Sequence, residues 1–273
     1  MAHIERKLGI NADCLRKSGI STCDTLMLAH QAGFSSFFNN FNCANANNVT
    51  ELKTLGDRLG MDYEFIHAPY RGINAMWEEG DGYTEIYNAM IATVDAASAN
   101  GVPAVITHVS SGWTAPPVND LGISRFDALV EYAAKKNVII ALENLRMVGN
   151  LTCLGDRYEG NPHVRFCYDC GHENCYTNPV SWIEYFRDRL LCTHIHDNAG
   201  RPFGDKSFDP DTHWLPLDGT MDYKSMMEKL DRYEYRGSLM LEVFNGMRPE
   251  YNAMAPEAFI AECYRRIKQI SQM

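Results

Sequence analysis

The sequence predicts an α/β protein folded as a (β/α)₈ barrel, in which eight parallel strands form the barrel and helices surround it. Two observations lead to this prediction. Short apolar segments alternate with longer amphipathic ones along the chain, and such alternation is typical of βαβ units that share a parallel sheet. There are eight such pairs in 273 residues, which is the number and length expected of this barrel.

The predicted strands are short, apolar and bounded by turn-forming residues. They cover residues 7–11, 34–41, 63–70, 104–109, 138–145, 164–170, 191–198 and 237–244. A doubly wound open sheet is the alternative, but its GxGxxG fingerprint after the first strand is absent from the sequence. We therefore expect one domain over residues 1–273.

Helices are predicted between these strands from their 3.6-residue periodicity and their end signals. Asp24 is the expected N-cap of the first helix, and Ser124 is that of the helix after the fourth strand. Gly60 and Gly101 are expected to end the second and third helices. Later helices are predicted in residues 178–190, 222–233 and 256–270, whereas the stretch after the fifth strand has no clear pattern.

Composition limits the class of protein. The formal charge of −10 argues against a general nucleic-acid binder, which normally has a basic face. The N-terminal residues lack the apolar core of a secretory signal, and no stretch has the length of a membrane span. The nine scattered cysteines suit a reducing compartment. We expect a cytoplasmic protein that does not bind membranes.

Polar side chains stand at the C-terminal end of six predicted strands. They are His67, His108, Glu143, Asp169, His194 and Glu242. Strands of a parallel barrel are buried and almost continuously apolar, so charged residues within them need an explanation. In this fold the C-terminal ends of the strands surround the active site. We therefore expect these side chains to form one site.

Glu143, Asp169, His194 and Glu242 come from the last four strands, which are neighbours around the barrel. Three carboxylates and one imidazole suit one divalent cation, with Mn²⁺, Mg²⁺, Co²⁺ and Zn²⁺ as candidates. The alternative is that each is a buried polar group with a local partner. Three buried carboxylates without a cation would repel one another, which favours the metal site.

The segment FCYDCGHENC, residues 166–175, allows two interpretations. Cys167 and Cys170 have the CxxC spacing of a zinc knuckle, but no turn residue separates them and no second CxxC exists in the chain. The favoured interpretation is that Asp169 is a ligand at the strand end and His172 the first loop residue with chemistry to offer. The cysteines are then packing residues.

Other candidate site residues follow the strands. His194 and His196 share a face of the seventh strand, so one is expected to bind metal while the other orients it or contacts substrate. Asp211 and His213 lie in a polar loop expected to cover the same mouth. Trp113 is a further candidate for substrate contact, as an apolar wall for a sugar. Arg201 is a candidate partner for a phosphate or hydroxyl, although an ordinary solvated loop is the slightly favoured interpretation there.

These motifs together resemble the xylose isomerase-like TIM barrels, a superfamily that includes sugar isomerases and epimerases, inosose dehydratases and endonuclease IV. The resemblance rests on ALEN with Glu143, YDCGH with Asp169 and His172, HIHDN with His194, DTH with Asp211 and His213, and LMLEVF with Glu242.

The resemblance to the ketose 3-epimerases of this family implies that Glu143, Asp169, His194 and Glu242 hold one divalent metal. It also implies that Glu143 and Glu242 are the catalytic acid/base pair and that His172 contacts substrate. Those epimerases carry a second glutamate six residues after the first, where this chain has Gly149.

The resemblance to endonuclease IV implies a different possibility, because those members use three zinc ions. The additional ligands would correspond to His67, His108, His172, Asp211 and His213, which are all present.

Three functions follow in order of preference. The first is a metal-dependent sugar or sugar-phosphate isomerase or epimerase that abstracts a proton next to a carbonyl. The second is a keto-sugar dehydratase or lyase, which begins with the same proton transfer. The third is a zinc phosphodiesterase. We expect a small carbohydrate substrate and a homo-oligomer, with no nucleic-acid partner.

Overall fold

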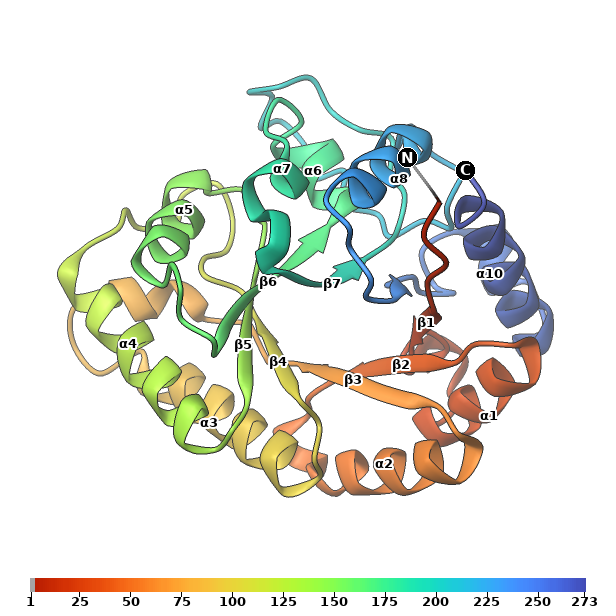
Figure 1. The fold of residues 1–273 in the computed structure, drawn as a ribbon, viewed down its shortest axis with the longest axis horizontal. Coiled ribbons are helices and arrows are strands. Elements are labelled where there is room, and N and C mark those ends of the chain that lie inside the picture. Colours follow the sequence, from red (N-terminus) through yellow and green to blue (C-terminus); the bar gives the residue numbers. More distant parts are fainter. Residues whose placement is uncertain (1–2) are drawn as a thin grey trace.

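The computed structural model describes residues 3–273, and its strands form a nearly closed parallel barrel (Figure 1). The strands are β1 (Leu8–Asn11), β2 (Ser36–Asn40), β3 (Asp62–His67), β4 (Ala104–Thr107), β5 (Ile139–Glu143), β6 (Val164–Asp169), β7 (Leu190–His194) and β8 (Leu239–Leu241). They follow the order β7-β6-β5-β4-β3-β2-β1-β8. A parallel bridge between Ile195 and Leu241 joins the two edges. The predicted eight-stranded barrel is confirmed.

Helices surround the barrel, and at least one α-helix follows each strand along the chain (Figure 1). They are α1 (Thr22–Ala32), α2 (Asn47–Leu59), α3 (Thr84–Ala99), α4 (Asp120–Lys135), α5 (Val148–Arg157), α6 (Cys170–Tyr176), α7 (Trp182–Phe186), α8 (Tyr223–Arg232), α9 (Pro249–Asn252) and α10 (Pro256–Ile270). Short 3₁₀ turns cover Arg16–Ser18, Cys43–Asn45, Ile73–Trp77 and Arg187–Arg189. Within residues 3–273, no helix combines the length and the apolar character needed to cross a membrane.

Two predicted helix starts were wrong. The N-cap of α1 is Ser21, whose Oγ accepts the backbone N–H of Asp24 and donates to the Asp24 carboxylate. This reciprocal pairing satisfies a free N–H of the first turn, which Asp24 alone would not do. The N-cap of α4 is Asn119, which accepts the N–H of Gly122, so the helix begins well before Ser124. A glycine inside the first turn concealed that start.

The predicted helix ends are confirmed at two glycines with positive φ. Gly60 caps α2 at φ 69°, and Gly101 follows the end of α3 at φ 65°. Both are in the left-handed region, which glycine enters without a Cβ clash. The stretch after β5, which had no clear pattern, forms α5.

Side chains that face into the barrel form a separate apolar cluster beneath the C-terminal ends of the strands. Its buried members are Phe38, Phe65, Ala104, Ile106, Ala141, Cys167, Cys192 and Met240. The Phe38 ring stacks on the imidazole of His194 at 4.9 Å between centroids. The barrel therefore places a dry floor directly under the polar strand ends.

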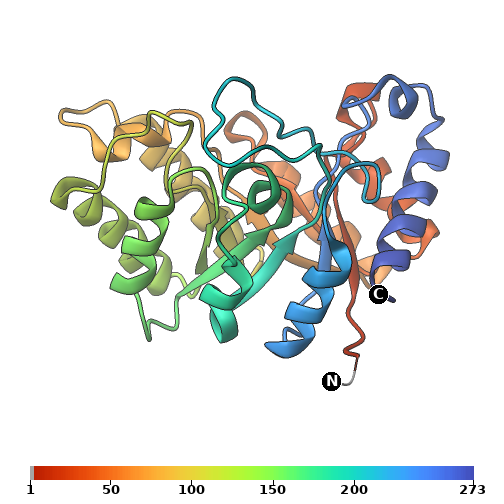
Figure 2. The ribbon, with the colours of Figure 1, turned by 90° about the horizontal axis from the view of Figure 1, so that it is seen from above.

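The long segment between β7 and α8 crosses one end of the barrel, and the N-terminal segment enters β1 from the other end (Figure 2). Backbone hydrogen bonds between Asp197 and Trp214 hold the two sides of this segment together. The Asp197 carboxylate also accepts the N–H groups of Leu217 and Met221. These contacts bring Asp211 and His213 over the strand ends.

Two helical glycines offer a matched test of packing around the barrel. A Cβ on Gly122 would lie 2.0 Å from Cε3 of the buried Trp77 indole, which donates to the Val109 carbonyl. A Cβ on Gly149, in α5, would meet no atom within 4 Å. We expect Gly122→Ala to lower the free energy of unfolding by about 1–3 kcal/mol.

Gly149→Ala is expected to leave the free energy of unfolding unchanged or to raise it by up to about 1 kcal/mol, because alanine favours the helix. Urea unfolding followed by circular dichroism measures both. Equal midpoints for the two variants would contradict the packing of Trp77 against α4.

Candidate metal centre

The structure brings the six polar strand-end residues to one end of the barrel. His67, Glu143, Asp169 and His194 are the last residues of β3, β5, β6 and β7, and His108 and Glu242 directly follow β4 and β8. All six side chains are buried. Because the strands are parallel, their C-terminal ends surround the same end of the barrel.

Four of these side chains form a compact group of potential ligands. Glu143, Asp169, His194 and Glu242 each offer one nitrogen or oxygen atom, and these atoms all lie within 4.8 Å of one another. Three carboxylates and one imidazole converge on a buried site, so positive charge is needed there. This donor set fits a divalent cation of intermediate hardness.

Glu143 lies at the centre of the site, and its two oxygens face different neighbours. Oε1 is 2.8 Å from Nδ1 of His194. Oε2 is 2.9 Å from Nε2 of His108 and 3.3 Å from Nε2 of His67. His67, His108 and Glu143 form a second group of potential ligands. Together with a group that contains Cys167 and His194, this one carboxylate belongs to three ligand groups.

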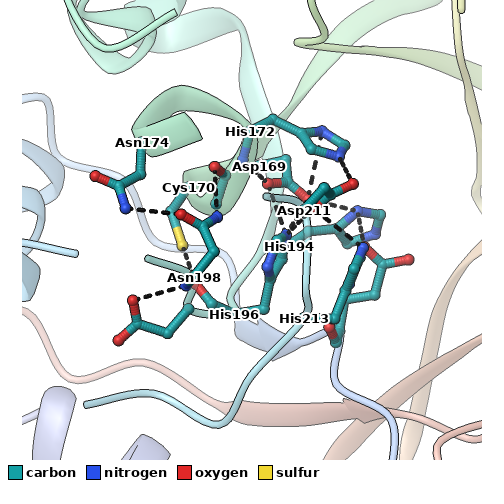
Figure 3. Close-up of polar contacts among 12 residues, drawn as sticks. Asp169, Cys170, His172, Asn174, His194, His196, Asn198, Asp211 and His213 are labelled. Carbon is teal, nitrogen blue, oxygen red and sulfur yellow. Dashed lines mark hydrogen bonds and ion pairs between the residues drawn. The ribbon is translucent and has the colours of Figure 1, made fainter. Parts of the chain in front are cut away.

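Asp169 connects the site to α6 (Figure 3). Its Oδ1 accepts the backbone N–H of His172 at 2.6 Å and lies 3.0 Å from Nε2 of His196. Asp169 thus caps α6, so His172 is in the first turn of a helix and not in a loop as predicted. The helix directs the His172 ring toward the same mouth, where its Nε2 is 3.2 Å from Oδ2 of Asp211.

A third group contains His172, His196, Asp211 and His213. Nε2 of His213 is 3.4 Å from Oδ1 of Asp211, and the rings of His196 and His213 stack at 3.9 Å. Oδ1 of Asp211 is buried and accepts no hydrogen bond from residues 3–273. A buried carboxylate oxygen without a partner is expected where a cation binds.

Charge balance supports the same interpretation. Burial by itself would raise the pKa of Glu143, but His194 and His108 outweigh it and hold that pKa well below its usual range. Burial lowers the pKa of His194, yet Glu242 and Glu143 raise it to about 9. Likewise Asp211 and Glu242 raise the pKa of His213 to about 10 against the effect of burial. The carboxylates stay ionised only beside positive charge, which protons or cations supply.

The cysteines of the CxxC segment face opposite sides of the barrel wall. Cys167 points into the interior cluster, while Cys170 lies outside it and donates to the carbonyl of His196. A zinc knuckle through both is therefore not formed. Cys167 does lie within ligand distance of Glu143 and His194. Burial raises the pKa of its thiol well above the usual value, which disfavours the thiolate that a metal needs.

A cavity of about 770 Å³ opens above the site. His67, His108, Glu143, His172, Asp211 and Glu242 are among the site residues that line it. Sequence reasoning missed several other lining residues: Arg16, Lys17, Tyr70, Arg71 and Phe244. The sequence signal that could have indicated them is their position, because they lie in the loops after β1, β3 and β8.

Trp113 and Arg201 lie beside this cavity and do not line it. The Arg201 guanidinium stacks 4.0 Å from the Trp113 ring, and Trp113 packs edge-on against Tyr176. Arg201 is buried, so it is not part of an ordinary solvated loop. Its role in substrate binding stays a prediction.

Comparison with known proteins places this barrel in a family. The family model for xylose isomerase-like TIM barrels matches residues 26–263. The chain belongs to this family. The match confirms the resemblance that the strand-end motifs carry, and the family accounts for a barrel whose polar residues lie at one end.

The solved structures that resemble the chain share this fold at low sequence identity. A D-psicose 3-epimerase from Clostridium cellulolyticum H10 is 13% identical with a TM-score of 0.75, covering 96% of this chain and 97% of that one. A 3-keto-D-glucoside 4-epimerase from E. coli is 15% identical with a TM-score of 0.70, covering 98% and 100%. A xylose isomerase domain protein from Planctomyces limnophilus is 14% identical with a TM-score of 0.74, covering 99% and 98%.

Among curated sequences, an uncharacterized protein of Sinorhizobium fredii is 31% identical over an alignment of 180 residues that covers 61% of this chain. The chain spans about half of that relative, 54% of its length.

Asp169→Asn and Cys167→Ala test the ligand assignment. Asparagine still caps α6, but it removes one anionic ligand, so we expect affinity for divalent metal to fall at least about tenfold. Cys167→Ala should retain the metal, because the thiol only packs. Elemental analysis of dialysed protein measures the bound metal, with circular dichroism as the folding control. Metal lost from Cys167→Ala and kept by Asp169→Asn would reverse the assignment.

Proposed function

We propose that this protein is a divalent-metal-dependent isomerase or epimerase of a sugar or sugar phosphate. The observation that carries the proposal is the group formed by Glu143, Asp169, His194 and Glu242, with two of its carboxylates lining a cavity large enough for a sugar. Two solved structures of the same fold are described as epimerases of sugars or keto-glucosides, which supports this class of reaction.

The proposed cation, held by these four residues, would supply positive charge near the oxygens on which negative charge develops when a proton leaves the adjacent carbon. The protein's own task is to remove that proton and to return it. The buried floor of the site keeps water away from the reacting carbon, which strengthens the electrostatic contribution of each charged group.

Glu143 and Glu242 differ in their freedom to carry a proton. Glu143 has imidazole nitrogens within 3.3 Å of both oxygens. Within residues 3–273, Glu242 has imidazoles near Oε2 alone, 3.2 Å from His194 and 3.7 Å from His213. We therefore assign Glu242 as the main proton carrier, and Glu143 as a ligand that takes part in transfer only when its histidine contacts loosen.

Two carboxylates on different strands also determine the outcome of the reaction. If Glu143 and Glu242 act from opposite faces of the substrate, one removes a proton and the other returns one, which inverts a stereocentre. If one of them performs both transfers, an aldose and a ketose interconvert. Loss of a substituent next to the deprotonated carbon would give the dehydratase or lyase instead.

A second candidate is a multinuclear zinc phosphodiesterase. It is favoured by the two further ligand groups, one with His67 and His108 and one with Asp211 and His213, which flank the first group on either side. The net charge of −10 counts against a nucleic-acid substrate, since phosphate contacts with basic residues supply most of that affinity.

Metal stoichiometry distinguishes the two candidates. Protein purified without chelator would be analysed for its elements, then assayed with ketoses, keto-glycosides and an abasic oligonucleotide. About one manganese, cobalt or magnesium ion per chain with ketose turnover supports the isomerase. About three zinc ions per chain with oligonucleotide cleavage would replace it by the phosphodiesterase.

Glu242→Gln tests the proton carrier. We expect the rate of the reaction and of deuterium incorporation from solvent into substrate to fall about 10²–10⁴-fold, because glutamine cannot exchange a proton. Because glutamine also removes one anionic ligand, the assay is run with excess divalent metal, and elemental analysis confirms that the variant is loaded. Glu228→Gln, on the exposed face of α8, is the matched control and should retain full activity. A near-normal exchange rate in Glu242→Gln would refute the assignment.

A further inference from the structure

The cavity above the candidate metal centre carries three cationic side chains that sequence analysis did not single out. Arg16 and Lys17 are in the 3₁₀ turn after β1, and Arg71 follows β3. All three are exposed and line the cavity. They come from two separate loops, so the barrel brings them together at its mouth.

These cations have no acidic partners. Among residues 3–273, no carboxylate lies within ion-pair distance of Arg16, Lys17 or Arg71. Arg146, which lines the same cavity, is by contrast paired with Asp209 at 2.5 Å. In a chain with ten more acidic than basic residues, an unpaired cationic group inside a cavity is a local exception. The cavity is also lined by carboxylates, namely Glu143, Asp209, Asp211 and Glu242, so the attraction for anions is local to the three unpaired cations.

Two aromatic rings connect these cations to the ligand histidines. The Arg16 guanidinium lies 5.2 Å from the ring of Phe244, which packs against His213 at 5.5 Å. Tyr70, next to Arg71 in the chain, stacks on His108 at 4.3 Å. On both sides of the mouth, one aromatic ring therefore separates the basic loop from the metal ligands. The ring of Phe244 thus lies between Arg16 and the candidate ligand His213.

This arrangement suits an elongated substrate with two different ends. One end would reach Glu143 and Glu242 on the floor, and a charged group at the other end would reach the basic loops. Arginine binds phosphoryl oxygens through paired, charge-assisted hydrogen bonds, and lysine contributes a point charge. A volume of about 770 Å³ is in the range that holds a small sugar phosphate.

We propose that the substrate carries a phosphoryl group at the end remote from the reacting carbon, and that Arg16, Lys17 and Arg71 bind it. This inference rests on the proposed function only in placing the reacting carbon at the floor of the cavity. The unpaired cations, their shared cavity and their separation from the floor support the phosphoryl site directly.

The test compares matched ketoses in binding. Calorimetry on the manganese-loaded protein would measure D-ribulose against D-ribulose 5-phosphate, and D-fructose against D-fructose 6-phosphate. We expect the phosphorylated member of at least one pair to bind at least about tenfold more tightly. Arg16→Gln and Arg71→Gln should each weaken that binding about tenfold, with little effect on the unphosphorylated sugar.

Arg58→Gln in α2 and Lys224→Gln in α8 are the controls, because both residues are exposed and lie outside the cavity. They change the net charge equally and should leave the preference intact. No preference in either pair, or a preference that the two cavity variants leave unchanged, would overturn the inference.

These experiments distinguish a failure of the proposed phosphoryl site from a failure of the proposed isomerase. Turnover of a ketose phosphate at a rate and affinity that Arg71→Gln leaves unchanged would overturn the phosphoryl site and leave the isomerase standing. Binding of a ketose phosphate through these residues, without proton exchange on any ketose, would support the phosphoryl site and overturn the isomerase. An abasic duplex that displaces the ketose phosphate and needs the same arginines would overturn the sugar as occupant in favour of a nucleic-acid backbone.

Discussion

The Glu143 carboxylate is the group on which the geometry of the site depends. It ends β5, and histidines from β3, β7 and the end of β4 all approach its two oxygens. Burial of a carboxylate is costly unless its charge is compensated. The imidazoles provide that compensation in the protein alone, and they take fixed positions around Glu143 as a result. The ligand group with His67 and His108 and the group with Asp169, His194 and Glu242 share this residue and therefore cannot be altered independently.

The barrel makes this concentration of charge tolerable. Beneath the carboxylates lies the cluster of Phe38, Phe65 and their neighbours, which excludes water and holds the His194 ring by stacking. Above them lies the cavity with its basic loops. Polar groups thus occupy a single layer between an apolar floor and an open mouth. Glu143 and Glu242 line that mouth, whereas Asp169 and His194 are fully buried and do not line it.

Much of the fold and of this layer was predictable from sequence. Strand periodicity and the parallel arrangement predict that residues such as Asp169 and Glu242 meet at one height, because the position of a strand-end side chain follows from the backbone alone. Helix starts were less predictable. At α4, the choice between Asn119 and Ser124 depended on which side chain could reach a free N–H. At α6, the Asp169 side chain itself begins a helix that the strand pattern conceals.

The loop residues of the site were largely beyond prediction. Side chains in loops have no periodicity, so nothing in the sequence indicates that Arg71 faces the cavity or that Trp113 covers Arg201. Position gives a partial signal, because every loop after a strand borders the mouth. Applied to Arg16 and Tyr70, that rule would have marked them as candidates. It could not have distinguished the unpaired Arg16 from Arg146, whose charge Asp209 neutralises.

Metal binding by Asp211 and His213 would change the order of the segment between β7 and α8. Residues 195–222 contain no helix or strand, and the Asp197–Trp214 bridge joins two parts of this segment to each other. Asp211 contacts His172, and His213 contacts the carbonyl of Glu242. Ordering a long loop costs chain entropy, and each ligand held at its tip offsets part of that cost. Occupancy of the third ligand group would therefore tighten this segment, and its susceptibility to proteases would become a direct readout of metal loading.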